Sequence, residues 1–183
     1  ITALAELGGD VNATDEKGFT AMHKASFQGH AGAIRLLVEL GGDVSALDSK
    51  EASPIISAVL GGHVDAITTL VQLGGEINNQ FGVGMTAICL AAVNGNVGII
   101  RALVKLGGDV NATFEGGRTA MYMAACEGLA DAIRELAEQG GDVNSRTSDG
   151  DTPVHVAAQR GDIEVITALA ELGGDVNATD EKG

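Results

Sequence analysis

The amino-acid sequence predicts an all-α repeat solenoid, a curved stack of helix pairs joined by hairpin-like turns. The first observation is a period of 33 residues, marked by Gly-Gly pairs that begin at Gly8, Gly41, Gly74, Gly107, Gly140 and Gly173. The second is composition, because 27 Gly, no Trp, one Tyr and four Phe leave only thin layers of aliphatic side chains for a core. Such short units cannot bury their apolar faces alone, so neighbouring units must stack.

Each period opens with a residue that favours the start of a helix. A Thr or Ser side chain can accept a hydrogen bond from a free N–H group of the first turn, and Pro54 and Pro153 follow where no N–H is needed. About nine residues later a Gly predicts the end of this first helix. The predicted starts are Thr20, Ser53, Thr86, Thr119 and Thr152, and the predicted ends are Gly29, Gly62, Gly95, Gly128 and Gly161.

A second helix follows in every period, with apolar residues at helical spacing on one face. The double glycine ends this helix, and the chain then reaches a turn that needs positive φ. The predicted apolar positions are Ile34, Leu37, Leu40, Ile67, Leu70, Leu73, Ile100, Leu103, Leu106, Ile133, Leu136, Ile166, Leu169 and Leu172. The predicted turn glycines are Gly18, Gly84, Gly117, Gly150 and Gly183.

Taken together, these residues resemble the ankyrin-repeat family. The stretches GFTAMHKASFQGHAGAIRLLVELGGDVSA and GDTPVHVAAQRGDIEVITALAELGGDVNA follow the family's G-x-T-P-L-H-x-A-A-x-x-G-H, I-V-x-x-L-L and G-A-D-V-N-A signatures. The likeness covers the whole chain without a break in phase. It implies a partial repeat at 1–13, repeats at 14–46, 47–79, 80–112, 113–145 and 146–178, and the start of another at 179–183.

The sequence departs from the family pattern at several places. A second Gly replaces the Ala of G-A-D, and the T-P-L-H block becomes SPII at 53–56, TAIC at 86–89 and TAMY at 119–122. Where His is absent, the resemblance implies that its hydrogen bond to Thr is lost, which predicts lower rigidity over 47–112. Glu51 replaces a turn Gly, where a left-handed backbone costs about 1 kcal/mol. Together with the pair Gly61-Gly62, this predicts that 47–79 is the softest repeat.

Residues 1–18 and 166–183 are identical, both reading ITALAELGGDVNATDEKG, at an offset of 165 residues or five periods. Residues 100–117 match 166–183 at only 13 of 18 positions. This predicts that a five-repeat block was copied whole and that the parent chain carries more copies of it. A designed consensus array is the alternative, but the five units differ widely from one another.

The bulk composition favours some classes of partner over others. A formal charge of −14 with only 11 Lys and Arg argues against nucleic acid and weakly favours a protein partner with a basic surface. No stretch approaches the roughly 18 to 20 uninterrupted apolar residues of a membrane span, so membrane insertion is not expected. Only two cysteines, Cys89 and Cys126, predict a reducing compartment and a cytoplasmic location.

No motif for chemistry stands out from the repeat. The sequence GVGMTA at 82–87 fits a dinucleotide-binding pattern, but repeat phase explains its glycines. The stretch 10–15 resembles the start of a calcium loop without its sixth-position Gly and twelfth-position Glu. The four histidines lack metal-ligand spacing, and neither Cys has a His-Asp partner pattern. The sequence therefore predicts no enzyme, no metal and no cofactor.

The function is then expected to lie on a binding surface. The resemblance implies a concave face formed by the turn tips and the exposed side of each first helix. Its variable contact positions fall on Glu16, Lys17, Phe19, Phe27, Gln28, Lys50, Leu60, Met85, Val93, Asn94, Arg118, Glu127, Asp151, Gln159 and Arg160. Phe19 and Phe27 are the best anchors, because aromatic residues supply much interface energy, and Met85 and Val93 could extend their apolar stripe.

Each contact residue has the alternative of being an ordinary surface or packing residue. For the whole chain, the main prediction is a non-catalytic scaffold for protein binding. The alternatives are an elastic spacer array without a specific ligand, or the recognition arm of a larger protein whose catalytic or membrane domain lies elsewhere.

Overall fold

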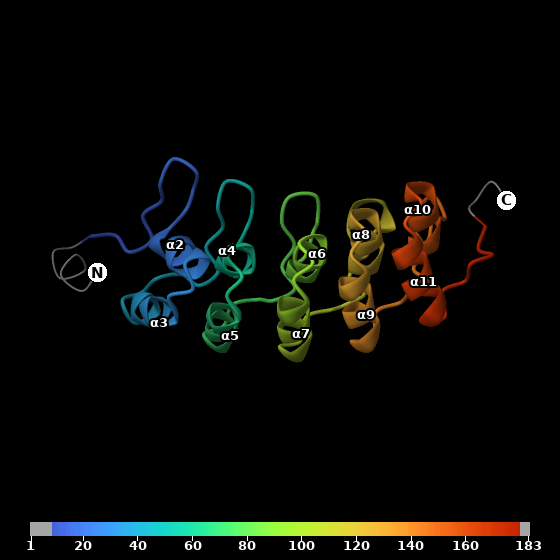
Figure 1. Ribbon diagram of the computed structural model, residues 1–183. Coiled ribbons are helices and arrows are strands. Elements are labelled where there is room, and N and C mark those ends of the chain that lie inside the picture. Colours follow the sequence, from blue (N-terminus) through green and yellow to red (C-terminus); the bar gives the residue numbers. More distant parts are fainter. Residues whose placement is uncertain (1–8, 180–183) are drawn as a thin grey trace. The chain divides into compact units, whose positions relative to one another are not determined.

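The computed structural model describes residues 9–179, which contain ten α-helices, one 3-10 helix and no β-strand. The chain divides into two compact units, Ile1–Gly82 and Val83–Gly183, called unit 1 and unit 2 below (Figure 1). The all-α repeat architecture predicted from the 33-residue period is confirmed. The predicted turn at Gly183 lies outside the described residues.

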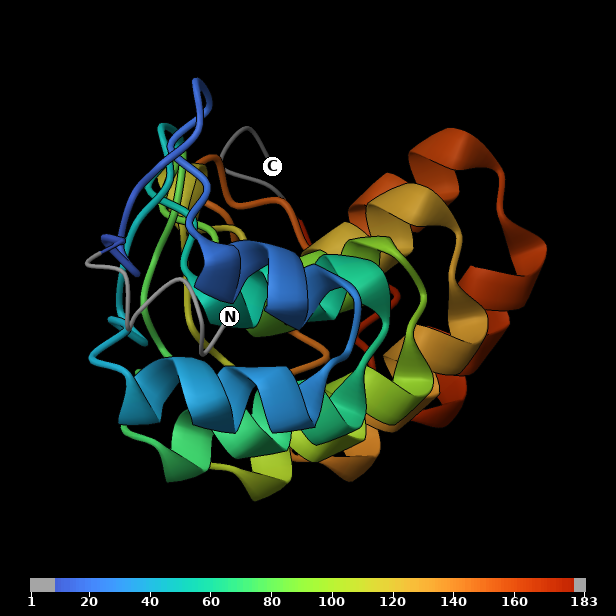
Figure 2. The ribbon, with the colours of Figure 1, turned by 90° about the vertical axis from the view of Figure 1, so that its left-hand side faces the viewer.

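Unit 1 contains two helix pairs arranged in two layers. The helices are α2 (Ala21–Phe27), α3 (Ala31–Glu39), α4 (Pro54–Gly61) and α5 (Val64–Gln72). The first helices, α2 and α4, pack against each other, and so do the second helices, α3 and α5 (Figure 2). The turns that precede α2 and α4 project beyond the helices on one side, so their tips lie beside the layer of first helices (Figure 1).

Unit 2 repeats this arrangement with three helix pairs. Its elements are α6 (Ala87–Val93), α7 (Val97–Lys105), the 3-10 helix η1 (Glu115–Gly117), α8 (Ala120–Glu127), α9 (Ala130–Glu138), α10 (Pro153–Arg160) and α11 (Ile163–Glu171). In the layer of first helices, α8 contacts both α6 and α10, and in the other layer α9 contacts both α7 and α11. The 3-10 helix belongs to the turn before α8, where Phe114 and Arg118 form an isolated antiparallel bridge.

The predicted helix starts and ends are confirmed. The hydroxyl groups of Thr20, Thr86, Thr119 and Thr152 accept the N–H of the residue three positions on, at 3.2 to 3.5 Å. Ser53 makes no such bond, and α4 begins instead with Pro54, whose fixed φ suits the first helical position. The five predicted end glycines all have positive φ, between 65° and 82°.

The core lies between the two helix layers of each unit. The Ile and Leu residues at the first two predicted positions of α3, α5, α7 and α9, and Leu169 of α11, are exposed by 2% or less. The residues at the third predicted position end the second helices instead of lying within them. These are Leu40, Leu73, Leu106 and Leu172, which are half-buried C-cap residues. Ile166 is also only half-buried, because no further described helix covers α11.

The turns have the backbone that the glycine pattern predicts. Gly18, Gly84, Gly117 and Gly150 have φ between 71° and 87°, and Glu51 takes the same left-handed region with φ 64°. Glu51 is the only described residue other than Gly with positive φ. The left-handed backbone expected at Glu51 is therefore confirmed, and strain of this kind costs of order 1 kcal/mol. The softness of repeat 47–79 stays a prediction.

Asparagine side chains connect successive turns at the ends of the second helices. In unit 1, the Nδ2 of Asn12 donates to the carbonyl of Gly41 at 3.0 Å, and its Oδ1 accepts the N–H of Asp43 at 2.8 Å. Asn111 and Asn144 make the same pair of bonds in unit 2. Ser45 occupies the corresponding position in repeat 14–46, and its shorter side chain makes no such pair among the described residues.

Candidate protein-binding groove

Two adjoining hollows lie beside the first helices of unit 1. The larger encloses about 520 Å³ and is lined by Lys17, Phe19, Asp48, Ser49, Lys50, Ala52, Ile56, Ser57, Leu60 and Phe81. The smaller encloses about 260 Å³ and is lined by Phe19, His23, Lys24, Phe27, Gln28 and Ser57. Because they share Phe19 and Ser57, we treat them together as the unit 1 groove.

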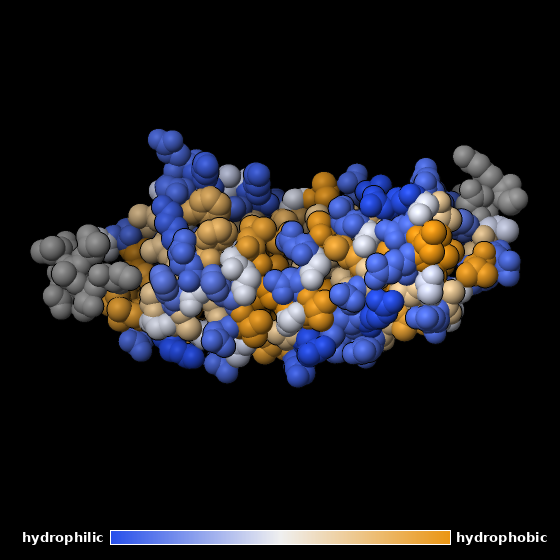
Figure 3. All heavy atoms as spheres, in the orientation of Figure 1, coloured by the Kyte–Doolittle hydropathy of each residue, from blue (hydrophilic) through white to orange (hydrophobic). Residues whose placement is uncertain are grey.

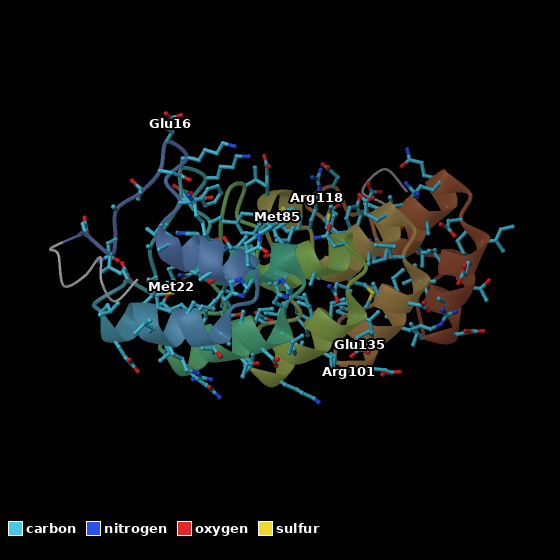
Figure 4. The ribbon with its side chains drawn as sticks, turned by 60° about the vertical axis from the view of Figure 1, so that its left-hand side comes forward. Glu16, Met22, Met85, Arg101, Arg118 and Glu135 are labelled. Carbon is cyan, nitrogen blue, oxygen red and sulfur yellow. The ribbon has the colours of Figure 1, made fainter. Side chains whose placement is uncertain are left out.

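The groove gathers most of the contact residues predicted in unit 1. Lys17, Phe19, Phe27, Gln28, Lys50 and Leu60 line it. Glu16 does not line it and lies at the tip of the turn before α2 (Figure 4). The polar turn tips project beside apolar side chains on the surface of unit 1 (Figure 3).

Large apolar side chains form much of the groove surface. Phe27 and Leu60, near the C-terminal ends of α2 and α4, are 48% and 56% exposed. Ile56 is buried in the floor between them and the turns. Phe19 is half-buried, and its ring meets the His23 ring edge-on with 5.7 Å between the centroids. Three of the four Phe residues of the chain line the groove, and exposed apolar surface of this kind marks interaction sites.

A buried histidine fixes the position of Phe19. The Nδ1 of His23 accepts the N–H of Thr20 at 3.2 Å, so its Nε2 carries the proton and donates to the carbonyl of Ala52 at 3.0 Å. This bridge joins α2 to the segment that leads into α4. It therefore holds the two sides of the groove together and gives the ring of Phe19 a rigid support.

The turn tips of unit 1 are held by aspartate side chains. The Oδ1 of Asp15 accepts the N–H groups of Lys17 and Phe19, each at 3.0 Å. The Oδ1 of Asp48 likewise accepts those of Lys50 and Ala52, at 2.8 and 2.9 Å. The two tips are joined by the N–H of Ser49, which donates to the carbonyl of Lys17 at 3.1 Å.

The lysines of the groove differ in their pairing. The Nζ of Lys24 lies 2.9 Å from the Oδ2 of Asp15, and this bond, aided by the backbone N–H groups, lowers the pKa of the Asp15 carboxyl. Lys17 and Lys50 form no ion pair with any described residue. Their ammonium groups therefore remain available beside the apolar surface.

The predicted contact residues of unit 2 form a more polar surface. Met85 and Val93 are half-buried, so little of their apolar surface is offered to a partner. Asp151 is half-buried in its turn, where its N–H donates to the hydroxyl of Thr147 at 3.1 Å. The other predicted residues are exposed and polar, namely Asn94, Arg118, Glu127, Gln159 and Arg160.

Loss of the repeat histidine has different consequences at different sites. Ile56 offers no hydrogen bond, as predicted. At Cys89 the histidine's bond is absent as well, but the Thr86 hydroxyl donates to the sulfur at 3.4 Å in its place. In the repeat with Tyr122, the Thr119 hydroxyl pairs instead with that of Ser145 at 2.9 Å. Burial raises the pKa of Cys89, and also those of Cys126 and Tyr122.

Sequence reasoning missed several residues of the groove. Lys24, Asp48, Ile56, Ser57 and Phe81 line it although they were not among the predicted contacts. Phe81 stands where the two preceding repeats have the turn residues Asp15 and Asp48, but the two following repeats have Phe114 and Thr147 there. The sequence therefore contains no signal that sets Phe81 apart as a groove residue.

The described residues hold no cluster of three or more His, Cys, Asp or Glu side chains that could bind a metal ion. Within residues 9–179, no helix combines the length and apolar character needed to cross a membrane.

A family model described as ankyrin repeats matches residues 1–81 and 88–180, in three copies. The chain therefore belongs to the ankyrin-repeat family, whose repeats are generally protein–protein interaction modules and are typically non-catalytic. The comparison with curated proteins finds no match.

Proposed function

We propose that this chain is a non-catalytic scaffold that binds another protein through the unit 1 groove. The exposed side chains of Phe27 and Leu60 carry the proposal, because they lie beside hollows that offer room for a partner's side chains. Burying such residues at an interface releases about 25 cal/mol for each Å² of apolar surface removed from water. The resemblance predicts that this face is the concave one.

Several features of the chain support binding more than chemistry. The buried thiol of Cys89 has a raised pKa, which disfavours the nucleophilic thiolate. The groove itself contains one carboxylate, Asp48, whose Oδ1 is engaged by backbone N–H groups.

Two substitutions test the groove without disturbing its support. Phe27→Asp and Leu60→Asp replace exposed side chains, whereas Phe19 also packs on His23 and is less suitable. The probe is a randomised twelve-residue peptide library displayed on phage and selected against the whole chain. We expect the wild type to enrich peptides that the Phe27→Asp and Leu60→Asp double variant no longer binds.

A matched control uses Ile163, an apolar residue of unit 2 that is 79% exposed. Ile163→Asp should leave the selected peptides bound, and circular dichroism should show that all variants retain their helices. If the wild type enriches no peptides other than those that the double variant also binds, the result would argue for the elastic spacer instead. The predicted contact residues of unit 2 and the further copies of the block remain predictions beside this proposal.

A further inference from the structure

We propose that the unit 1 groove recognises an acidic peptide segment, in which a bulky apolar residue is flanked by Asp or Glu. This inference rests on the proposed function and specifies the chemistry of its partner. It follows from the lysines that line the groove, Lys17, Lys24 and Lys50, together with the exposed Phe27 and Leu60.

The concentration of lysines is unusual for this chain. It carries 25 Asp and Glu against 11 Lys and Arg, and only five of the latter are lysines. Three of those five line the two hollows, where the one lining carboxylate is that of Asp48. The lining charges are therefore positive in sum, opposite to the charge of the whole chain.

Two acids at the groove are already engaged by the fold. Asp48 accepts two backbone N–H groups of its own turn, and Asp15 accepts two more while pairing with Lys24. Lys17 and Lys50 have no carboxylate partner among the described residues. A partner carboxylate can therefore reach them without first breaking an ion pair.

The groove orders these groups along its length. Lys17 and Lys50 sit on the two turn tips, and Phe27 and Leu60 lie near the C-terminal ends of α2 and α4. A peptide that places its apolar side chain against Phe27 and Leu60 thus brings neighbouring carboxylates toward the tips. Complementary charges of this kind mainly set specificity and the rate of association.

Local charge outweighs net charge at such a site. The net charge alone weakly favours a basic partner, but at about 0.1 M salt charges beyond roughly 10 Å are largely screened. The electrostatic energy of a segment bound in the groove is therefore set mainly by the lysines that it touches. Glu16 and Glu51 are exposed on the same tips. A short peptide can place its carboxylates on Lys17 and Lys50 away from these acids, whereas a broad anionic membrane surface would meet the glutamates as well.

The same peptide library tests the charge preference. We expect the peptides enriched by the wild type to combine bulky apolar residues with flanking Asp or Glu. Fluorescence anisotropy at about 50 mM salt should then show binding weakened about tenfold by Lys17→Glu or Lys50→Glu. Lys105→Glu makes the same charge change in unit 2, at α7, and should alter binding by less than about twofold.

The outcomes separate this inference from the proposed function. One outcome would overturn only the acidic preference. In it, the selected peptides lack carboxylates and bind all three lysine variants equally, but they do not bind the Phe27→Asp and Leu60→Asp double variant. If the wild type enriches no peptide that the double variant fails to bind, both this inference and the proposed function are overturned. If the chain sediments with phosphatidylserine vesicles, and if substitution of Lys17 or Phe27 prevents this, the partner is an anionic membrane and the acidic-peptide inference is overturned.

Discussion

Phe27 and Leu60 of unit 1 occupy the same place in the 33-residue period as Val93, Cys126 and Gln159 of unit 2. The place of Lys17 and Lys50 on the unit 1 turns is taken by Val83, Gly116 and Asp149. Unit 1 therefore combines large apolar side chains with lysines at these two places, whereas unit 2 has no lysine and no side chain as large as Phe or Leu at an apolar position there. The difference shows that the repeat backbone accepts different side chains at these places, so units with the same fold present different surfaces.

The two units make different contacts between their second helices. In unit 1, the Nη2 of Arg35 of α3 donates to the hydroxyl of Thr69 of α5 at 3.2 Å. In unit 2, Arg101 of α7 pairs with Glu135 of α9 at the same level (Figure 4). A histidine bridge lies next to the turns in both units, from His23 to Ala52 and from His155 to Ala178. Four tests address these contacts, the packing of α4 on α2, and the turns.

The largest effect is expected at Gly61, the last residue of α4. A Cβ atom there would overlap the carbonyl oxygen of Phe27 and lie 2.7 Å from the ring of His63. The corresponding positions of unit 2 carry side chains, Glu127 and Arg160. Gly61→Ala should therefore force α2 and α4 apart and lower the free energy of unfolding by about 2 to 4 kcal/mol, measured by urea denaturation.

Gly32 in α3 is the matched control, because a Cβ atom there meets nothing within 4 Å. Gly32→Ala should stabilise the chain by up to about 1 kcal/mol, since Ala is the better helix former. Equal effects of the two substitutions would show that close packing of α4 on α2 is not what holds the groove.

The next effect is expected at the ion pair of unit 2. Glu135 is 3% exposed, and its carboxylate accepts from Arg101 and from Gln139. Arg101→Gln removes the main counter-charge and should lower the stability of the chain, by less than the loss of a fully buried pair would because Arg101 is 49% exposed. Thermal unfolding monitored by circular dichroism measures this loss.

This cost should also depend on pH. The bond from Arg101 lowers the pKa of Glu135 in the folded chain, against the opposing effect of burial. The pair therefore adds stability above the pKa of the unfolded carboxyl, and that stability is lost as pH falls through the lower folded pKa. The difference between wild type and Arg101→Gln should shrink from pH 7 toward about pH 3. A constant difference would mean that Arg101 acts through packing alone.

A smaller gain is expected at Glu51. Its left-handed backbone suits Gly, so Glu51→Gly should raise the free energy of unfolding by about 1 kcal/mol. Glu16→Gly is the control, since Glu16 lies exposed in the neighbouring turn without positive φ. If both substitutions destabilise the chain, strain at Glu51 does not explain a soft repeat.

The smallest effect is expected at Ser45. Ser45→Asn should allow the two bonds that Asn111 makes in unit 2 and stabilise unit 1 by about 0.5 to 1 kcal/mol. Amide hydrogen exchange should be fastest in 47–79 in the wild type and slower there in Ser45→Asn. Faster exchange in another internal repeat would contradict the predicted softness.

The sequence by itself determined the period, the helix boundaries and the turn backbone. A Thr hydroxyl bonds to an N–H three residues away, and the conformation of Gly or Glu51 is set at that residue, so these features follow from neighbours along the chain. The resemblance also indicated the turn tips and first helices as the candidate surface, and six of the predicted residues line the groove.

Only the tertiary structure decided what those residues form. It buried Glu135 against Arg101, placed Phe81 and Lys24 in the groove, and required a residue without a side chain at Gly61. Most of these outcomes depend on side chains about one period apart that meet when one helix pair packs on the next. A periodic pattern predicts that such a contact exists, but the volumes and charges brought together decide whether it becomes core, ion pair or groove.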